Sequence, residues 1–179
     1  MIDFGVLEPA AAQAHCDAYA AAVPDRVAWL EHEVTRTGGP PLRRTPDDLV
    51  PAWEWAWQRL REPDGPSVDL PGRPPWYSAE RANPYLSDGA LWLVDALGCY
   101  LATLAQDAVP EARWGVRRVA KRLKDVDQQR TMLMGLPGER PADPTRMVYG
   151  EVIGPVVHGE PVDPRALRRL YDALVPPAA

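Results

Sequence analysis

The chain has 179 residues, 46% of them hydrophobic and 25% charged, and its formal net charge is −5. This length supports one well-buried core but not two comfortable ones, and nucleic-acid-binding proteins are usually basic overall. The longest apolar run, residues 90–94, ends at Asp95, well short of the roughly 18 apolar residues of a membrane span. The N-terminus has no basic segment ahead of an apolar one, so we expect no secretory signal and a cytoplasmic location.

The charge is unevenly distributed along the chain. Residues 1–86 carry 13 acidic groups and 8 Arg, whereas residues 87–179 carry 12 groups of each sign. The acidity therefore belongs to the first half, which favours a basic partner there. The two cysteines are too few for a disulfide framework.

The first elements are expected to be two helices. Residues 9–22 are rich in Ala and predict one helix, and Pro24 is expected to start a second. The second helix would place three apolar residues on one face: Val27, Leu30 and Val34. The Thr-Gly-Gly-Pro-Pro run at residues 37–41 predicts its end.

A third helix is expected to open at Thr45, because Thr is a good N-cap and Pro46 suits the first helical position. The acidic pair that follows, Asp47 and Asp48, lies where the helix dipole favours negative charge. Since Pro51 is awkward inside a helix, we expect the regular part to begin near it and to reach about residue 61.

Three tryptophans lie within this third helix. Trp53 and Trp57 are four residues apart and share one face, whereas Trp55 points about 200° away from Trp53. We therefore expect Trp53 and Trp57 to be buried and Trp55 to be exposed beside Glu54. An exposed indole of this kind is a candidate anchor for a protein partner.

Residues 62–86 are rich in Pro and contain Trp76, Tyr77 and Tyr85. They predict a long irregular loop, whose aromatic side chains either cover the core or form a partner surface. Covering the core is the commoner case.

Ser87 is expected to cap the strongest helix of the chain, which reaches about residue 108. Its apolar residues recur at helical spacing almost all round, so it should be the central and most buried helix. Gly98 within it is unfavourable by about 1 kcal/mol relative to Ala, which indicates close approach of another element.

Alternation over residues 113–117 predicts a half-buried strand with Trp114 and Val116 facing inward, and residues 129–135 predict a second strand. We expect a hairpin that turns near residues 125–127. Three residues between the strands have helical spacing instead, so a short helix over residues 117–128 is the alternative: Val119, Leu123 and Val126.

Two further helices end the chain. Residues 145–157 are expected to be helical until Gly154–Pro155 interrupts them, and Asp163–Pro164 is expected to start the last helix. That helix would bury Leu167, Leu170, Tyr171 and Leu174. The predicted fold is α+β and mainly helical, with a small antiparallel hairpin packed on the central helix. Residues 1–86 form an N-terminal helical region and residues 87–179 a helix–hairpin–helix–helix core, together one compact unit.

A family resemblance appears in the second half of the chain. The positions that carry it are Asp95, Leu97, Gly98, Tyr100, Leu101, Trp114, Val116, Pro144, Val148, Val152 and Gly159. On these positions, residues 87–175 resemble a small uncharacterised bacterial α+β domain family. The resemblance implies a fold, and it supplies no activity or catalytic residue.

Catalytic patterns are missing from the sequence. None of the three serines lies in a Gly-x-Ser-x-Gly turn. Cys99 lies inside the apolar helix and should be an inert core thiol, and Asp17 would raise the pKa of Cys16 rather than lower it. We therefore assign no catalytic residue and no cofactor.

The best metal constellation would join His15, Cys16 and Asp17 on the first helix with the Glu-His-Glu triplet around His32 on the second. The two triplets could meet if the helices form a hairpin about Pro24, and such side chains are competent zinc ligands. A small metal-assisted enzyme is therefore the alternative function. We favour solvated helix surface, because adjacent residues of a helix diverge by about 100°.

One basic cluster stands out: Arg113, Arg117, Arg118, Lys121, Arg122 and Lys124. It could contact nucleic-acid backbone, or it could be the solvated face of an edge strand, where positive charge discourages sheet association. The net negative charge favours the second interpretation.

The residues we assign to partner binding are Trp55, Trp76, Tyr77, Asp47, Asp48 and Glu54. The alternative for the aromatic residues among them is a satellite core formed by the third helix and the Pro-rich loop. We expect a non-catalytic bacterial protein-interaction module, resembling acidic immunity or inhibitor proteins that bind a basic partner. The bound protein could also be a second copy of the chain, forming a homodimer.

Overall fold

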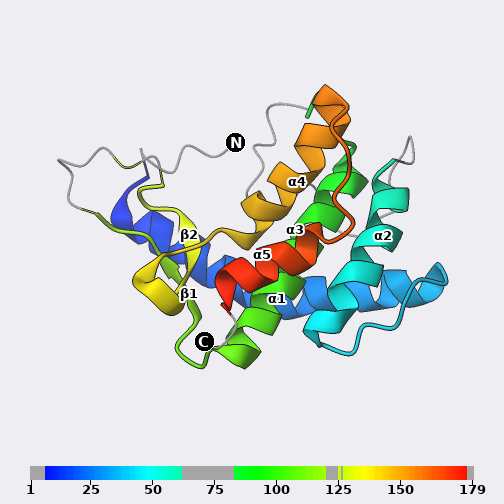
Figure 1. The fold of residues 1–179 in the computed structure, drawn as a ribbon. Coiled ribbons are helices and arrows are strands. Elements are labelled where there is room, and N and C mark those ends of the chain that lie inside the picture. The colour runs from blue at the N-terminus through cyan, green and yellow to red at the C-terminus, as the bar shows by residue number, and fades with distance from the viewer. Residues whose placement is uncertain (1–6, 62–82, 120–124, 126, 177–179) are drawn as a thin grey trace.

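The computed structural model describes residues 7–61, 83–119, 125 and 127–176. Within them the chain forms five α-helices and one two-stranded antiparallel sheet, which confirms the mainly helical α+β class (Figure 1). In chain order the elements are α1 (Pro9–Arg36), the 3-10 helix η2 (Pro46–Asp48), α2 (Leu49–Leu60), α3 (Asp88–Ala108), β1 (Arg113–Val116), β2 (Thr131–Met134), the 3-10 helix η4 (Pro137–Glu139), α4 (Pro144–His158) and α5 (Ala166–Leu174).

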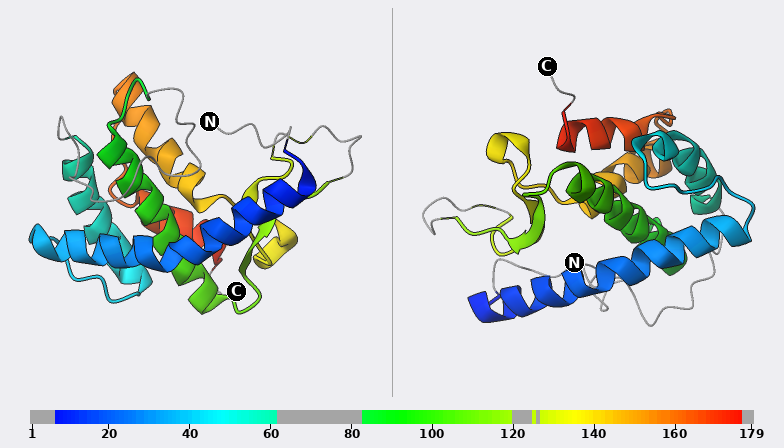
Figure 2. Two further views of the ribbon diagram at one scale, coloured as in Figure 1. Left: turned by 180° about the vertical axis from the view of Figure 1, so that it is seen from behind. Right: turned by 90° about the horizontal axis from the view of Figure 1, so that it is seen from below.

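The first helix is a single 28-residue rod, so the break expected at Pro24 is wrong (Figure 2). Pro24 has no N–H to donate to the carbonyl of Ala20, a loss of about 3 kcal/mol in a helix interior. The rod nevertheless continues because its apolar stripe is buried on both sides of the proline: Ala12, Cys16, Tyr19, Val23, Val27, Leu30 and Val34. Burying one such side chain contributes about 1.5–3 kcal/mol, so the stripe outweighs the local defect.

The segment after α1 is fixed by a carboxylate. Asp48 accepts hydrogen bonds from the backbone N–H groups of Arg43 (2.7 Å) and Thr45 (2.9 Å) and from the hydroxyl of Tyr100 (3.0 Å). Thr45 and Asp48 also form a capping box around η2, as the N-cap pattern predicts. Pro51 falls in the first turn of α2, where its missing N–H has little effect.

The central helix α3 is the most buried element of the described chain, as expected. The hydroxyl of Ser87 accepts a hydrogen bond from the N–H of Ala90 at 3.1 Å and so caps the helix. A Cβ placed on Gly98 would lie 2.5 Å from the Cα of Thr145, which confirms the expected close approach of another element, α4. By length and composition alone α3 could cross a membrane, but most of it is buried within the fold, which is compatible with a soluble protein.

The hairpin pairs β1 with β2 in the register Trp114 to Leu133. Hydrogen bonds between Arg117 and the pair Gln129 and Arg130 extend it beyond the strands. This pairing supports the hairpin over the alternative helix at the described positions. The strands make most of their helix contacts with α1, where Tyr19 meets Trp114 edge-on at a ring distance of 5.0 Å.

The last two helices differ from expectation only at their ends. Asp143 caps α4 by accepting a hydrogen bond from the N–H of Arg146 at 3.0 Å. The helix runs through Pro155 and ends at Gly159, whose φ of 66° is the left-handed conformation typical of a helix end, so the expected interruption at Gly154–Pro155 is wrong. Helix α5 buries the four predicted residues, Leu167, Leu170, Tyr171 and Leu174.

Candidate functional site

The indole of Trp55 is buried, with only 8% of the residue exposed, so the expected exposed anchor is wrong. Its Nε1–H donates to the hydroxyl of Thr37 at 3.0 Å, and a Cβ placed on Gly39 would lie 2.6 Å from Cδ1 of the ring, so the chain packs closely against the indole there. The opposite face of α2 is buried too, since Trp53 is 1% exposed and donates to the carbonyl of Asp163 at 2.9 Å. Helix α2 therefore has neighbours on two sides, which its own pattern could not reveal.

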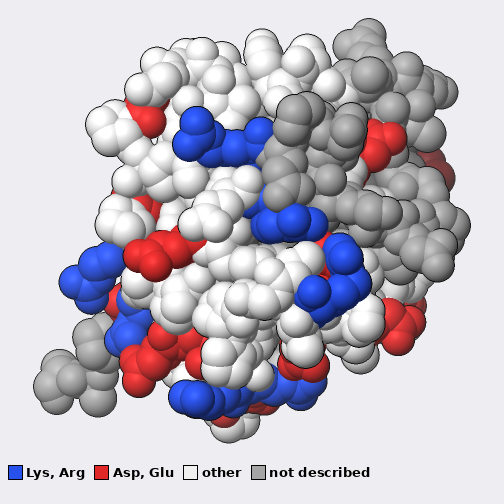
Figure 3. Space-filling view, turned by 90° about the vertical axis from the view of Figure 1, so that its right-hand side faces the viewer, with Lys and Arg blue, Asp and Glu red and all other residues white. Residues whose placement is uncertain are grey.

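The other residues assigned to partner binding are not brought together in the described part of the chain. Asp48 is buried as the last residue of η2, within the capping box, whereas Asp47 is exposed and forms an ion pair with Arg168 at 3.3 Å. Glu54 is exposed, and Trp76 and Tyr77 lie outside the described residues. On the side of the molecule that carries α2, acidic and basic side chains lie next to one another (Figure 3).

The candidate metal site is not assembled. Because α1 is continuous, His15 and His32 lie on one rod about 25 Å apart along its axis. His15 instead contacts the hydroxyl of Thr131 through Nδ1 at 3.1 Å, and burial raises the pKa of the Cys16 thiol. Within the described ranges no three His, Cys, Asp or Glu side chains are placed to hold a metal ion.

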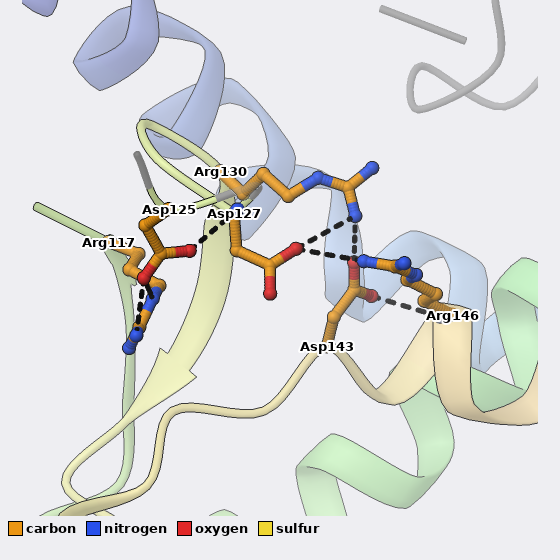
Figure 4. A network of polar contacts seen from close by, with 6 residues as sticks. All are labelled: Arg117, Asp125, Asp127, Arg130, Asp143 and Arg146. Atoms are coloured by element: carbon orange, nitrogen blue, oxygen red, sulfur yellow. Dashed lines mark hydrogen bonds and ion pairs between the residues drawn. The ribbon is translucent and has the colours of Figure 1, made fainter. Parts of the chain in front are cut away.

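Charged side chains from the segment that joins β1 to β2 and from the start of α4 form a cluster that we call the hairpin Asp–Arg cluster (Figure 4): Arg117, Asp125, Asp127, Arg130, Asp143 and Arg146. Arg117 pairs with Asp125 at 2.6 Å and lowers the pKa of that carboxyl. Arg146 pairs with Asp127 at 2.8 Å, and Arg130 lies 3.6 Å from both Asp127 and Asp143.

Three positive and three negative side chains balance in this cluster, and they join the hairpin to the start of α4. Arg117, one of the basic residues singled out in the sequence, is thus engaged in an ion pair within the fold. Arg113 and Arg118 are exposed, whereas residues 121, 122 and 124 lie outside the described part.

A second group, which we call the buried polar cluster, lies between α1, α3 and α4: Tyr19, Arg26, Asp95, Cys99 and Thr145. Nε of Arg26 and a carboxylate oxygen of Asp95 are 2.9 Å apart, and the side chains are 5% and 0% exposed. The hydroxyl of Tyr19 donates to Asp95 at 3.3 Å and lies 3.0 Å from the hydroxyl of Thr145.

The buried polar cluster is closed to a substrate. Burial, followed by the charge of Asp95, raises the pKa of Cys99 to about 12, so the thiol is inert as expected. The guanidinium of Arg26 stacks 4.6 Å from the centre of the Tyr19 ring, which completes its enclosure. The cluster fixes the register of three helices. The sequence signal for this cluster was Asp95, an acidic residue within a nearly all-apolar helix.

A further candidate site is a hollow of about 410 Å³ between α2, the chain entering α3 and the end of α4. We call it the α2–α4 hollow, and it is lined by Trp57, Leu60, Arg61, Tyr85, Leu86, Ser87, Pro155 and Val156. Tyr85 (54% exposed) and Val156 (38% exposed) are the two exposed large hydrophobic residues among those described, and both line it. The hollow could not be predicted from the sequence, because the residues that line it come from three separate segments of the chain.

Comparison with protein-family models, with curated proteins and with solved structures gives no match to this chain. The resemblance of residues 87–175 to a bacterial domain family gains no support from it. Function therefore has to be argued from the geometry and chemistry of the sites.

Proposed function

We propose that the chain is a non-catalytic protein-interaction module of the bacterial immunity or inhibitor type. In this proposal the α2–α4 hollow receives an apolar side chain of a basic partner protein. The observation that carries the proposal is the position of Tyr85 and Val156. Two exposed large hydrophobic side chains that meet on one hollow support the proposal, because contiguous exposed apolar surface often belongs to an interaction site.

The lining of the hollow suits a protein anchor. Trp57 is half-buried and offers an aromatic wall, while Leu60 and Pro155 add apolar surface. Arg61 and Ser87 supply polar groups. An apolar centre with polar groups beside it is the usual anatomy of a binding hot spot, in which Trp and Tyr are enriched.

The overall charge supports a basic partner. A net charge of −5 attracts a positively charged protein from beyond contact distance and raises its rate of association. A cytoplasmic location belongs to the same proposal. The metal-assisted alternative has no support from geometry, because His15 and Cys16 lie far from His32 on one helix.

The test compares co-purification from the native host by the wild-type chain and by Val156→Arg, which places a charge in the hollow. The matched control is Arg118→Glu, which changes an exposed residue of the hairpin. We expect a basic protein that co-purifies with the wild type and the control and is lost with Val156→Arg. A basic protein retained by Val156→Arg, or a partner that is acidic, would contradict the proposal.

A further inference from the structure

The strand β1 is paired along one edge only among the described residues. Its partner there is β2, whose own outer edge is covered by the bridge between Leu133 and Ala142. Figure 1 shows the hairpin at the end of the molecule opposite to α2. The outer edge of β1 therefore has no strand beside it in the described part of the chain.

The register shows which backbone groups lie on this outer edge. In an antiparallel pair, residues whose backbone bonds to the partner strand alternate with residues whose backbone points away from it. Leu133 exchanges both of its backbone hydrogen bonds with Ala142, at 2.7 and 3.0 Å. Its backbone therefore points away from β1, and the N–H and C=O of Trp114, which lies opposite to it, point away from β2.

Val116 repeats this arrangement two residues further along the strand. Arg117, by contrast, donates its N–H to the carbonyl of Arg130 at 2.9 Å, so the residues between the outward ones face β2. No hydrogen bond joins the outward N–H and C=O groups of Trp114 and Val116 to any other described residue. Such a row of backbone groups is the template to which an extended peptide adds as a further strand.

The charge around this edge is positive. Arg113 and Arg118, on either side of the two edge residues, are both exposed, and neither forms an ion pair with a described residue. Arg113 donates to the carbonyl of Glu111 at 3.3 Å, and Arg118 donates to the amide oxygen of Gln13 at 3.4 Å. Both partners are neutral, so the two positive charges stay uncompensated. The edge therefore complements an acidic segment.

A second copy of the chain fits this edge poorly. One antiparallel arrangement of two β1 strands matches Trp114 of one copy with Val116 of the other. It places Arg113 of each copy opposite Arg117 of the other, and like charges directly opposite each other destabilise a sheet. A nucleic acid offers no matching row of N–H and C=O groups. The edge therefore favours an acidic peptide.

We propose that β1 binds an extended acidic peptide segment as a third strand, through the N–H and C=O groups of Trp114 and Val116. Residues directly opposite each other share a face of the sheet. The peptide residues that bond to the edge therefore point toward α1, as Trp114 does where its ring meets Tyr19. The residues between them face outward with Arg113 and carry the acidic groups. This surface is separate from the α2–α4 hollow and does not depend on the partner proposed there.

Amide hydrogen exchange, followed by NMR, tests the edge with the whole chain. Without a peptide, the amides of Trp114 and Val116 should exchange at least about tenfold faster than the amide of Gly115, which faces β2. The probe is a short capped peptide in which Val alternates with Glu. Its addition should slow the exchange of Trp114 and Val116 saturably and leave Gly115 unchanged.

Three matched peptides test the mode of binding. N-methylation of the Val residues should weaken binding about tenfold or more, because their amides donate to the edge. N-methylation of the Glu residues should have little effect, because their amides face away from it. Replacement of every Glu by Lys should abolish binding, because the edge is positive.

A charge-reversed variant tests the role of the two exposed arginines. Arg113→Glu combined with Arg118→Glu should weaken binding of the acidic peptide about tenfold or more, and it should allow the Lys peptide to bind instead. The matched control is Arg140→Glu, which changes an exposed residue beyond β2 and should bind as the wild type does.

The proposal is overturned if the amides of Trp114 and Val116 exchange as slowly as that of Gly115 in the free chain, since the edge would then already be paired. It is equally overturned if the acidic peptide gives no saturable protection of both amides, or if the two N-methylated peptides bind alike. Protection that rises with the concentration of the chain alone would assign the edge to a second copy and would also overturn it.

Discussion

Arg26 and Asp95 form an ion pair of 2.9 Å between α1 and α3, with side chains that are 5% and 0% exposed. Removing one partner of such a pair leaves a buried charge without compensation, which costs about 3–5 kcal/mol. We therefore predict that Asp95→Asn lowers the free energy of unfolding by about that amount in urea titrations. The double variant Arg26→Met, Asp95→Leu should recover most of the loss, since it removes both charges. A double variant less stable than Asp95→Asn would show that the pair itself stabilises the fold.

Gly98 provides a test of helix packing. Ala is a better helix former than Gly by about 1 kcal/mol, but a Cβ on Gly98 would lie 2.5 Å from the backbone of Thr145. We predict that Gly98→Ala destabilises the chain by about 1–3 kcal/mol, because α3 and α4 must move apart. The control is Gly150→Ala in α4, where nothing lies within 4 Å of the new Cβ and a small gain in stability is expected. A stabilising Gly98→Ala would contradict the close packing of the two helices.

Trp55 should behave as a core residue. Trp55→Ala is predicted to cost about 3–5 kcal/mol in the free energy of unfolding, similar to Trp53→Ala, because both rings are buried. Thr37→Val, which removes only the acceptor of the Trp55 indole, should cost about 1 kcal/mol. Acrylamide quenching of single-tryptophan variants checks the burial directly. Trp55 quenched more readily than the half-buried Trp57 would contradict it.

Stability should fall in alkaline solution. Burial raises the pKa of Cys99 to about 12 from its ordinary 9.0, and it raises the pKa values of Tyr19 and Tyr100 above 10.0. When the pH lies between the ordinary pKa of such a group and its raised pKa, the unfolded chain releases a proton that the folded chain keeps. Rising pH therefore favours unfolding. The full free energy of unfolding is therefore retained below about pH 9, and it falls progressively as the pH rises above that value. Urea titrations at about pH 8 and about pH 10.5 measure the fall, which should be shallower in Cys99→Ala.

The parts of the fold that the sequence predicted correctly depend on neighbouring residues. The caps at Ser87 and Asp143 and the buried stripe of α5 follow from local chemistry. The errors occurred where distant elements decide the outcome. Pro24 lies within a continuous helix because burial of the flanking residues outweighs the local penalty. Pro155 also lies within a continuous helix, but only residues before it are buried, and Val152 is the nearest of them.

The candidate site was less predictable, for a related reason. Trp55 was expected on a free face of α2, but the chain at Thr37 and Gly39 covers it, and no periodicity within α2 shows that. Conversely, Tyr85 and Val156 are far apart in the sequence and meet on one hollow only after folding. A surface assembled from several segments leaves no motif in any one of them.

The most direct test of the proposed interaction is photo-crosslinking in the native host, with a benzophenone amino acid at position 156 of α4. The control places it at Gly150, an exposed position of the same helix. We predict that position 156 crosslinks to one basic protein in good yield, that position 150 does not, and that Tyr85→Ala reduces the yield. Equal labelling from both positions, or crosslinks confined to the chain itself or to a second copy of it, would contradict a basic partner at the α2–α4 hollow.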